Sequence, residues 1–228
     1  MKKKIIGYGA GGHAGVIIDI IEDNNEYKIE GLVDKIKAKK KYGYKIIGND
    51  LKLDQIYKKY KNIFFGIAGI KSIKKNILLY NKLEKIGFNI VSIIHQKSII
   101  SKNTKIGKSI KIFSGVKINS NVILGKNVFV NTGAIIEHDC KIGDHSQIGP
   151  GVMLSGGVKI KKGCFIGIGS KINQNIIVGE NSIVGSGSVV IKNIKKNSIY
   201  AGIPAKKIGV LEWKKLQYLQ QQEVIFLF

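Results

Sequence analysis

The sequence predicts an α/β N-terminal domain, built on a small Rossmann-like parallel sheet, over residues 1–96, followed by an all-β parallel β-helix over residues 97–204. Three observations support this fold class. Short apolar runs alternate with helical segments in the first part, and a glycine-rich turn follows its first apolar run. Aliphatic residues recur at every sixth position through the second part. Residues 205–228 are expected to form a C-terminal tail.

The N-terminal part divides into strands and helices that alternate along the chain. We expect strands in KKIIGYG (3–9), YKIEGLVD (27–34), NIFFGIAG (62–69) and FNIVSII (88–94). The segments between them predict helices over residues 14–23, 51–60 and 71–86. Strands that alternate with helices form parallel sheets. No Pro- or Ser-rich linker follows the last strand, so the domain boundary is placed near residue 96.

The second part is a run of sixteen consecutive hexapeptides from Lys97 to Lys192, without a single insertion. The fourth residue of every hexapeptide is Ile, Leu or Val, and the second is always small or aliphatic. Gly, Asn, Ser and Asp gather between these positions, where corners need positive φ or local hydrogen bonds. Each hexapeptide therefore predicts one short strand with its fourth residue inward, and three hexapeptides predict one coil. An ordinary amphipathic sheet would have turns at irregular spacing.

The C-terminal segment leaves the repeat after Lys192. The stretch LEWKKLQYLQQQEVIFLF (211–228) is compatible with a terminal helix, but its apolar residues form no continuous stripe. No chemistry is assigned to it.

Composition excludes several classes of protein. All 38 basic residues among the 228 are lysines, so the net charge of +23 comes without the arginine fork on which specific DNA readers depend. No apolar run reaches the roughly 20 residues of a membrane span, and the N-terminus lacks a secretory apolar region. Two cysteines are too few for a disulfide framework, and Cys140 and Cys164 are expected to be buried. We therefore expect a cytoplasmic protein that binds neither nucleic acid nor membrane.

The glycine-rich turn Gly7-Tyr8-Gly9-Ala10-Gly11-Gly12 predicts a phosphate-binding loop. It lies between a strand and a helix, and Asp34 follows at the end of the second strand, where a ribose-binding acid is expected. This pattern alone suggests a dinucleotide cofactor and a dehydrogenase. The same turn holds any phosphate at a helix N-terminus, and the domain is short for a full dinucleotide fold. Nucleotide binding is therefore preferred to NAD binding, with His13 either contacting a phosphate or capping the helix.

Among the four histidines, His138 is the candidate for chemistry. It follows the inward-facing Ile136 at a corner and has Glu137 and Asp139 on either side. Neighbouring carboxylates raise the basicity of an imidazole and fix its tautomer, which suits a general base. A solvated surface histidine is an equally good interpretation of the same residues. The repeat region contains only two histidines, so a three-histidine metal site is not expected.

Four features taken together carry a resemblance: GYGAGGHAG, the uninterrupted hexapeptides, IIEHDCKIGD and the closing AGIPAKKI. Over residues 3–208 the chain resembles the bacterial sugar acetyltransferases of the left-handed β-helix superfamily. The similar group comprises the bacillosamine-pathway and perosamine N-acetyltransferases and the sialic acid O-acetyltransferases. The resemblance alone implies a left-handed coil, because parallel crossovers are otherwise right-handed and the spacing does not show the hand.

The resemblance also implies a homotrimer that transfers an acetyl group from acetyl-CoA, without a metal, to a nucleotide-linked amino sugar in bacterial glycan biosynthesis. We expect a 4-amino-4,6-dideoxy sugar to be the acceptor. Sialic acid O-acetylation is the runner-up, and an NAD-dependent oxidoreductase or a purely structural β-helix are the remaining alternatives.

The residues that match the family's functional positions fall into three sets. His138 matches the base, Asp139 the acid that supports it, and Asn131 a polar active-site residue. Gly11, Gly12 and His13 match the loop that holds the nucleotide sugar, and Asp34 the acid after the second strand. Positions matching acetyl-CoA contacts are Gln147, Ile168, Ser186, Pro204 and Lys206.

Three positions depart from the family pattern. Gln147 stands where bacillosamine-type relatives have a histidine near the thioester, so that contact must differ. Ser186 replaces a glycine, which a backbone contact would survive. Lys35 replaces a second acid after Asp34 and leaves the nucleotide open.

Overall fold

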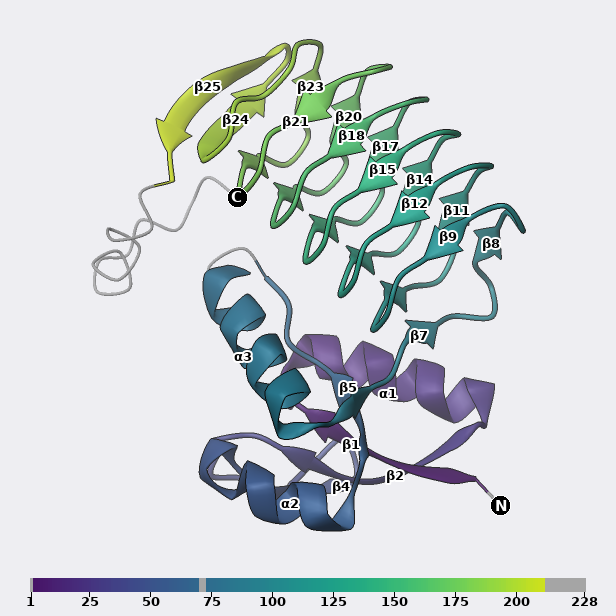
Figure 1. Cartoon of the computed structure of the whole chain (residues 1–228), viewed down its shortest axis with the longest axis vertical. Helices are drawn as coiled ribbons and strands as arrows, with labels where there is room; N and C mark the ends of the chain where they lie inside the picture. Colours follow the sequence, from purple (N-terminus) through teal and green to yellow (C-terminus); the bar gives the residue numbers. More distant parts are fainter. Residues whose placement is uncertain (1, 70–72, 212–228) are drawn as a thin grey trace. The chain divides into compact units, whose positions relative to one another are not determined.

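A computed structural model describes residues 2–69 and 73–211 of the chain (Figure 1). These residues form two compact units. The first comprises residues up to Gln96 together with Lys108–Ile110, and the second comprises Lys97–Gly107 and the residues from Lys111 onward. No helix of the described residues is long and apolar enough to cross a membrane.

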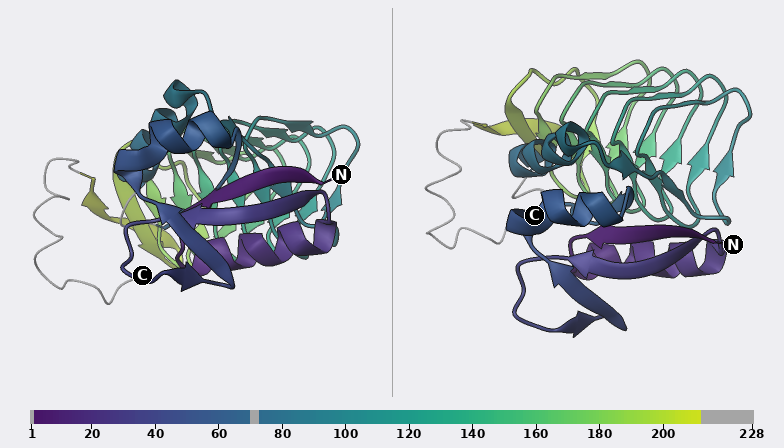
Figure 2. Two further views of the ribbon diagram at one scale, coloured as in Figure 1. Left: turned by 90° about the horizontal axis from the view of Figure 1, so that it is seen from below. Right: turned by 60° about the horizontal axis from the view of Figure 1, so that its bottom comes forward.

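The first unit is built on a six-stranded sheet with the order β3-β4-β2-β1-β5-β6. Its strands are β1 (Lys3–Tyr8), β2 (Tyr27–Val33), β3 (Lys40–Lys41), β4 (Tyr44–Gly48), β5 (Asn62–Phe65) and β6 (Asn89–Ile90). Its helices are α1 (Gly12–Asn24), α2 (Leu53–Lys59), which follows a 3₁₀ turn at Asp50–Lys52, and α3 (Ile73–Ile86). All strand pairs are parallel except β3 with β4. Figure 2 shows helices on either side of this sheet.

The order of the strands places a switch point beside β1. The chain passes from β1 to β2 on one side of it and returns to β5 on the other. In open α/β sheets, ligands bind at the carboxyl ends of the strands at such a point. A cluster of buried side chains fixes these strand ends; it includes Ile6, Tyr8, Val33, Ile63 and Phe65.

The structure differs from the sequence analysis of this unit in two places. The segment FNIVSII is not one strand, because β6 ends at Ile90 and a separate short strand, β7 (Ile93–Ile94), follows. The hairpin of β3 and β4 was not expected, since its lysine-rich first strand has little strand propensity. Its turn consists of Tyr42 and Gly43, both with positive φ, as two-residue hairpin turns require.

The second unit is a parallel β-helix of two-residue strands at six-residue spacing (Figure 1). Each strand from β8 to β20 pairs in parallel with the strand 18 residues further on, as Lys117 with Ile135 and Ile118 with Ile136. One coil therefore contains three hexapeptides, as predicted. The strands are β8 (Ile99–Ile100), β9 (Lys105–Ile106), β10 (Lys111–Ile112), β11 (Lys117–Ile118), β12 (Ile123–Leu124), β13 (Phe129–Val130), β14 (Ile135–Ile136), β15 (Lys141–Ile142), β16 (Gln147–Ile148), β17 (Met153–Leu154), β18 (Lys159–Ile160), β19 (Phe165–Ile166), β20 (Lys171–Ile172), β21 (Ile177–Val178), β22 (Ile183–Val184) and β23 (Val189–Val190).

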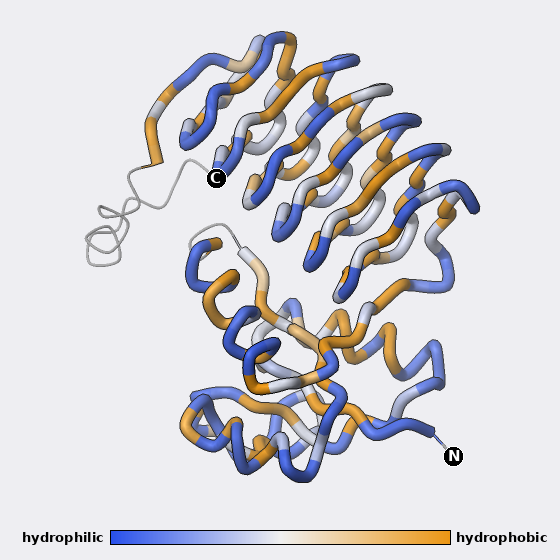
Figure 3. Tube along the Cα trace, in the orientation of Figure 1, coloured by the Kyte–Doolittle hydropathy of each residue, from blue (hydrophilic) through white to orange (hydrophobic). Residues whose placement is uncertain are grey.

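The interior of the coil follows the repeat. Every fourth-position residue from Ile112 to Val190 is buried, and the hydropathy-coloured trace alternates accordingly (Figure 3). Buried second-position serines donate to backbone carbonyls, as Ser146 Oγ does to Lys161 O at 2.8 Å. Cys140 and Cys164 occupy the same second position, and both are buried free thiols, as predicted.

The corners of the coil use left-handed backbone. At one corner the successive coils place Gly115, Gly133, Gly151, Gly169 and Gly187, all with positive φ. At another they place Asn121, Asp139, Gly157 and Asn175, again all with positive φ. Glycine, asparagine and aspartate are the residues that tolerate this conformation. The corner positions thus select for residue types that also supply polar side chains.

The C-terminal end differs from the expectation of a tail from residue 205. The strands β24 (Ser198–Gly202) and β25 (Ala205–Val210) form an antiparallel hairpin, and β24 continues the sheet of β22. Residues 205–210 are therefore part of the folded unit, because their backbone groups pair with β24. The terminal helix considered for residues 211–228 falls on residues 212–228, outside the described residues.

Candidate active site

His138 lies at a corner of the β-helix with its ring exposed. The strand β14 buries Ile136, and the chain then turns through Glu137, His138 and Asp139. Asp139 has φ 61°, and its carboxylate Oδ2 lies 2.8 Å from Nδ1 of His138. The side chains of His138 and Asp139 are 58% and 57% exposed. The structure thus brings the two predicted residues together at a surface that a substrate can reach.

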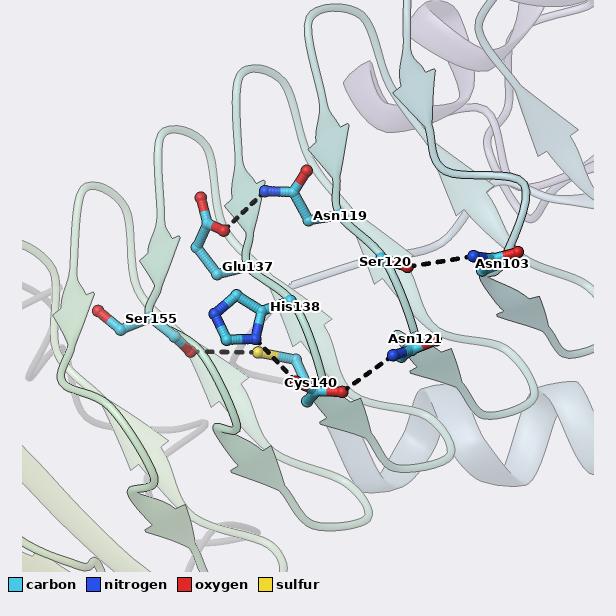
Figure 4. Close-up of polar contacts among 9 residues, drawn as sticks. Asn103, Asn119, Ser120, Asn121, Glu137, His138, Cys140 and Ser155 are labelled. Carbon is cyan, nitrogen blue, oxygen red and sulfur yellow. Dashed lines mark hydrogen bonds and ion pairs between the residues drawn. The ribbon is translucent and has the colours of Figure 1, made fainter.

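Two asparagines of the preceding coil hold the carboxylates beside this histidine (Figure 4). The side-chain amide of Asn121 donates to Oδ1 of Asp139 at 3.3 Å, and that of Asn119 donates to Oε2 of Glu137 at 2.6 Å. The hydrogen bond from His138, and then that from Asn121, lower the pKa of Asp139 below its usual range. Asp139 is therefore ionised at neutral pH and stabilises positive charge on the ring.

Gly156, one coil after His138, makes room for the imidazole. A Cβ atom at Gly156 would lie 2.7 Å from both Cε1 and Nε2 of the ring, a distance that no real side chain keeps. Gly156 is buried, and its φ lies outside the left-handed region. Glycine is required at position 156 because the ring leaves no room for a side chain, and not because of the backbone conformation.

The cysteine nearest this corner takes no part in nucleophilic chemistry. The Cys140 thiol donates to the Ser155 carbonyl at 3.2 Å, and burial raises its pKa to about 11. A thiol is a nucleophile only as the thiolate. Burial likewise raises the pKa of Cys164, to about 12. Among the described residues, no group of three His, Cys, Asp or Glu side chains is placed to hold a metal ion.

Asn131 lies on a different corner from His138. Its Oδ1 accepts from the backbone N–H of Thr132 at 2.8 Å and from the Thr132 hydroxyl at 3.3 Å, and it makes no hydrogen bond to His138 within the described part of this chain. Ile168 and Ser186 lie on the corner of Asn131 in later coils, where the N–H of Gly187 donates to Ile168 O at 2.7 Å. Both are exposed.

The other predicted acetyl-CoA positions are spread over one sheet of the coil. Gln147 is the third residue of its hexapeptide, in β16, and it is buried. Pro204 belongs to the turn of the terminal hairpin, and Lys206 pairs with Ala201 across it. Within one chain, therefore, the predicted catalytic and acetyl-CoA residues occupy two corners and one sheet of the coil, and His138 and Asp139 contact one another.

The glycine-rich loop of the first unit leaves a helix N-terminus open. Gly11 is the N-cap of α1, no side chain caps it, and no acidic residue lies in the first turn. Apart from the adjoining residues and the backbone of α1 itself, no described atom lies within 4 Å of a Cβ placed on Gly11 or Gly12. The partial positive charge at the N-terminus of this 13-residue helix favours an anion at this place.

Asp34 shapes this loop. Its Oδ2 accepts from the Ala10 N–H at 2.7 Å, and its Oδ1 accepts from the Ile36 N–H at 3.1 Å. Its expected contact with a ribose stays a prediction. Next to it lies a pocket of about 170 Å³ at the switch point of the sheet, whose polar lining is Tyr8, Asp34, Lys35, Asp50, Lys75 and Asn76.

Most of this lining was not predicted. Tyr8 donates from its hydroxyl to Oδ1 of Asp50 at 2.6 Å, and burial together with Asp50 raises the pKa of Tyr8 above its usual range. In the glycine-rich motif, Tyr8 is a variable position between two glycines, so the motif does not indicate its contact with Asp50. Asp50 follows β4, a strand that was not predicted from the sequence. In contrast, Asn121 and Gly156 could have been predicted from the sequence, because they lie 18 residues from Asp139 and His138, respectively, which is the length of one coil.

Comparisons with known proteins agree with this architecture. A model of the PglD N-terminal domain matches residues 4–83, and a model of the bacterial transferase hexapeptide (six repeats) matches residues 121–156 and 157–192. No curated protein sequence matches the chain. The fold as a whole is shared with PerB from Caulobacter crescentus, solved with CoA and GDP-perosamine: the two chains are 29% identical, with a TM-score of 0.84, over 90% of this chain and 97% of that one.

The chain is an acetyltransferase that is similar to the hexapeptide-repeat sugar acetyltransferases. Two other solved structures extend the likeness. The acetyltransferase domain of PglB from Neisseria gonorrhoeae, solved with acetyl coenzyme A, is 26% identical, with a TM-score of 0.84, over 91% of this chain and 100% of that one. WeeI from Acinetobacter baumannii is 25% identical, with a TM-score of 0.79, over 90% and 100%. The predicted fold class, with its left-handed β-helix, is confirmed for this acetyltransferase.

Proposed function

We propose that this acetyltransferase moves the acetyl group of acetyl-CoA to the amine of a nucleotide-linked 4-amino-4,6-dideoxy sugar, with His138 as general base. The observation that carries the proposal is the 2.8 Å contact between Nδ1 of His138 and Asp139 on an exposed corner. PerB, which shares the fold, was solved with CoA and GDP-perosamine, an amino-sugar nucleotide.

The His138–Asp139 pair supports a direct transfer. Asp139 accepts a hydrogen bond from the Nδ1–H tautomer, which leaves the lone pair of Nε2 to accept a proton. The sugar amine attacks the thioester carbonyl, Nε2 takes the proton that the amine loses, and the proton then passes to the departing CoA thiolate. A positioned base of this kind contributes roughly 10²–10⁴-fold. Both cysteines are protonated at neutral pH, so the chemistry needs no acyl-enzyme.

The oxyanion requires a donor near the same ring. The N–H of Gly156 has no hydrogen-bond acceptor within the described residues, and its residue lies against the imidazole. Its N–H is therefore our candidate donor to the developing negative charge on the thioester oxygen. Holding the two substrates side by side supplies the remaining rate enhancement.

A homotrimer would complete this site. One chain places His138 on one corner and Asn131, Ile168 and Ser186 on another, so a single copy does not join the base to the expected acetyl-CoA contacts. Packing three copies around an axis would bring the His138 corner of one chain to the Asn131 corner of the next. We therefore place acetyl-CoA between neighbouring copies.

The first unit would hold the nucleotide. The open N-terminus of α1 at Gly11 and Gly12 suits a diphosphate, with His13 in the same turn, and the adjacent pocket suits the nucleoside. Lys35 in that pocket adds a positive charge where relatives have an acid, so the nucleotide need not be that of PerB.

A substrate panel tests the proposal. The full chain is incubated with acetyl-CoA and with UDP-, dTDP- or GDP-linked 4-amino-4,6-dideoxy sugars, CMP-linked sialic acid, or no acceptor, and free thiol is measured. We expect thiol release with one amino-sugar nucleotide and an N-acetylated product by mass spectrometry. Release with the sialic acid alone would support O-acetylation instead. Binding of NADH without thiol release from any acceptor would contradict the proposal.

A further inference from the structure

Asn121 contacts the carboxylate that supports His138. The two oxygens of Asp139 have separate partners, because Oδ2 faces Nδ1 of His138 at 2.8 Å and Oδ1 accepts from Nδ2 of Asn121 at 3.3 Å (Figure 4). The side chain of Asp139 is otherwise exposed, so these two contacts define its orientation.

The backbone of the coil places this asparagine. Asn121 and Asp139 are 18 residues apart on the same corner, and both have left-handed backbone, with φ of 59° and 61°. Their side chains therefore leave stacked coils in the same direction. The next residue of this corner is Gly157, so the left-handed conformation itself does not require an amide.

We propose that Asn121 is a positioning residue that holds the Asp139 carboxylate in the orientation that fixes the Nδ1–H tautomer of His138. This inference rests on the proposed role of His138 as base. An exposed carboxylate without a second partner would sample several rotamers, and the hydrogen bond to Nδ1 would be made only part of the time. The Nε2 lone pair would then be available in a smaller fraction of molecules.

The other titratable groups around the ring do not replace this contact. Glu137 is held by Asn119 at 2.6 Å, on the other side of the histidine. Cys140 is a neutral thiol bonded to the Ser155 carbonyl. Asp139 is thus the charged partner of His138, and Asn121 is the side chain that fixes it.

Two variants at position 121 separate positioning from folding. Asn121→Gly removes the amide and keeps a residue that tolerates positive φ, whereas Asn121→Asp keeps the shape and replaces the donor by an acceptor. Asn181→Gly is the matched control, since Asn181 has φ 53° on another corner. For Asn121→Gly we expect kcat to fall about tenfold, the loss typical of one hydrogen bond to a charged group, with KM for acetyl-CoA unchanged.

The pH profile is the readout that a purely structural role would not move. In Asn121→Asp a second carboxylate stabilises the protonated imidazolium, so the acid limb of kcat/KM should move to higher pH. Asn121→Gly should lower the plateau without that movement. In Asn181→Gly, the plateau and the acid limb of the pH profile should both match those of the protein without substitutions.

A measurement without substrate separates this inference from the proposed function. In protein labelled with ¹⁵N at histidine, the Nδ1 and Nε2 resonances of His138 should report the Nδ1–H tautomer, and Asn121→Gly should shift them toward a tautomer mixture. Resonances and pH profile unchanged in both variants would overturn the inference while leaving the function standing. Absence of acetyl transfer by the unchanged chain, with the tautomer shift observed, would instead overturn the function alone.

Discussion

At the scale of single residues, the site depends on close approaches that the coil period creates. His138 contacts Asp139 within its own corner and lies against Gly156 of the coil after, while Asn121 of the coil before donates to Asp139. The contacts of Asn121 with Asp139 and of Gly156 with His138 follow from the same 18-residue offset. The chemistry of one corner is therefore distributed over three coils.

The Gly156→Ala variant tests the fit of the ring. The added methyl group would lie 2.7 Å from two ring atoms, so the imidazole must turn away, and we expect kcat to fall by about tenfold or more. The change in φ/ψ preference is tolerated, so thermal unfolding should change little. Gly209→Ala is the control, because its Cβ would meet nothing closer than 3.4 Å. Equal activity in both variants would contradict the packing of His138 on Gly156.

Asp139→Asn tests the charge of the dyad. Asparagine tolerates the positive φ of this position, so the backbone is preserved while the carboxylate is lost. We expect kcat to fall by roughly 10² or more, because the amide neither stabilises the imidazolium nor fixes the same tautomer.

Because the pKa of Asp139 is lowered in the folded protein, its stabilising contacts are complete above the unfolded pKa, near 3.9, and are lost as pH falls through the lower folded value. Unfolding curves from pH 6 to 2 for both proteins would show whether the acid-side loss depends on residue 139.

At the scale of elements, the strands are held by the interior of the coil rather than by their own length. Two-residue strands have few hydrogen bonds each, so the buried fourth position carries much of their stability. Ile136 is fully buried immediately before the corner of His138, whereas Ile106, also the fourth residue of its hexapeptide, is 41% exposed. Equal substitutions at these two places should therefore have unequal effects.

Ile136→Ala should lower the free energy of unfolding by about 2–5 kcal/mol, the range found for large-to-small changes in cores. Ile106→Ala should cost well under half as much, because its side chain is partly in water already. Denaturant titrations of the two variants measure the difference. Equal losses would show that the fourth position does not carry the stability of the coil.

The same elements show where prediction from sequence succeeds. The hexapeptide period gives every strand from β8 to β23, because the inward residue, the small second residue and the corner all repeat together. The hairpin of β3 and β4 and the break between β6 and β7 escaped prediction, since neither leaves a periodic signal. His138 and Asp139 were found because they adjoin in sequence, whereas Tyr8 and Asp50 meet only through the sheet order.

At the scale of the whole molecule, the proposed site requires more than one copy of the chain. The proposed base lies on one corner of the β-helix, and Ile168 and Ser186 lie on another, in later coils. Among the described residues, Asn131 makes no hydrogen bond to His138. Two inactive variants should therefore complement one another. His138→Ala and Ser186→Trp, which would block the expected acetyl-CoA corner, are each expected to abolish most activity.

Mixed trimers of these two variants would regain activity at an interface formed by one unaltered corner from each chain. Co-purification of differently tagged copies provides such mixtures, and turnover is compared with that of each variant alone. We expect a clear gain in the mixture. No gain, in trimers shown to contain both chains, would contradict a site shared between copies.

The turnover number of His138→Ala shows whether His138 is the general base. The variant and the unchanged chain are compared with the acceptor identified in the substrate panel, alongside Lys102→Ala, an exposed residue at the same position of the coil two turns earlier. If His138 is the general base, we expect kcat to fall by about 10² or more in His138→Ala, with the oligomer and the thermal midpoint unchanged. Lys102→Ala should keep near-normal turnover. Near-normal turnover by His138→Ala would contradict that role of His138.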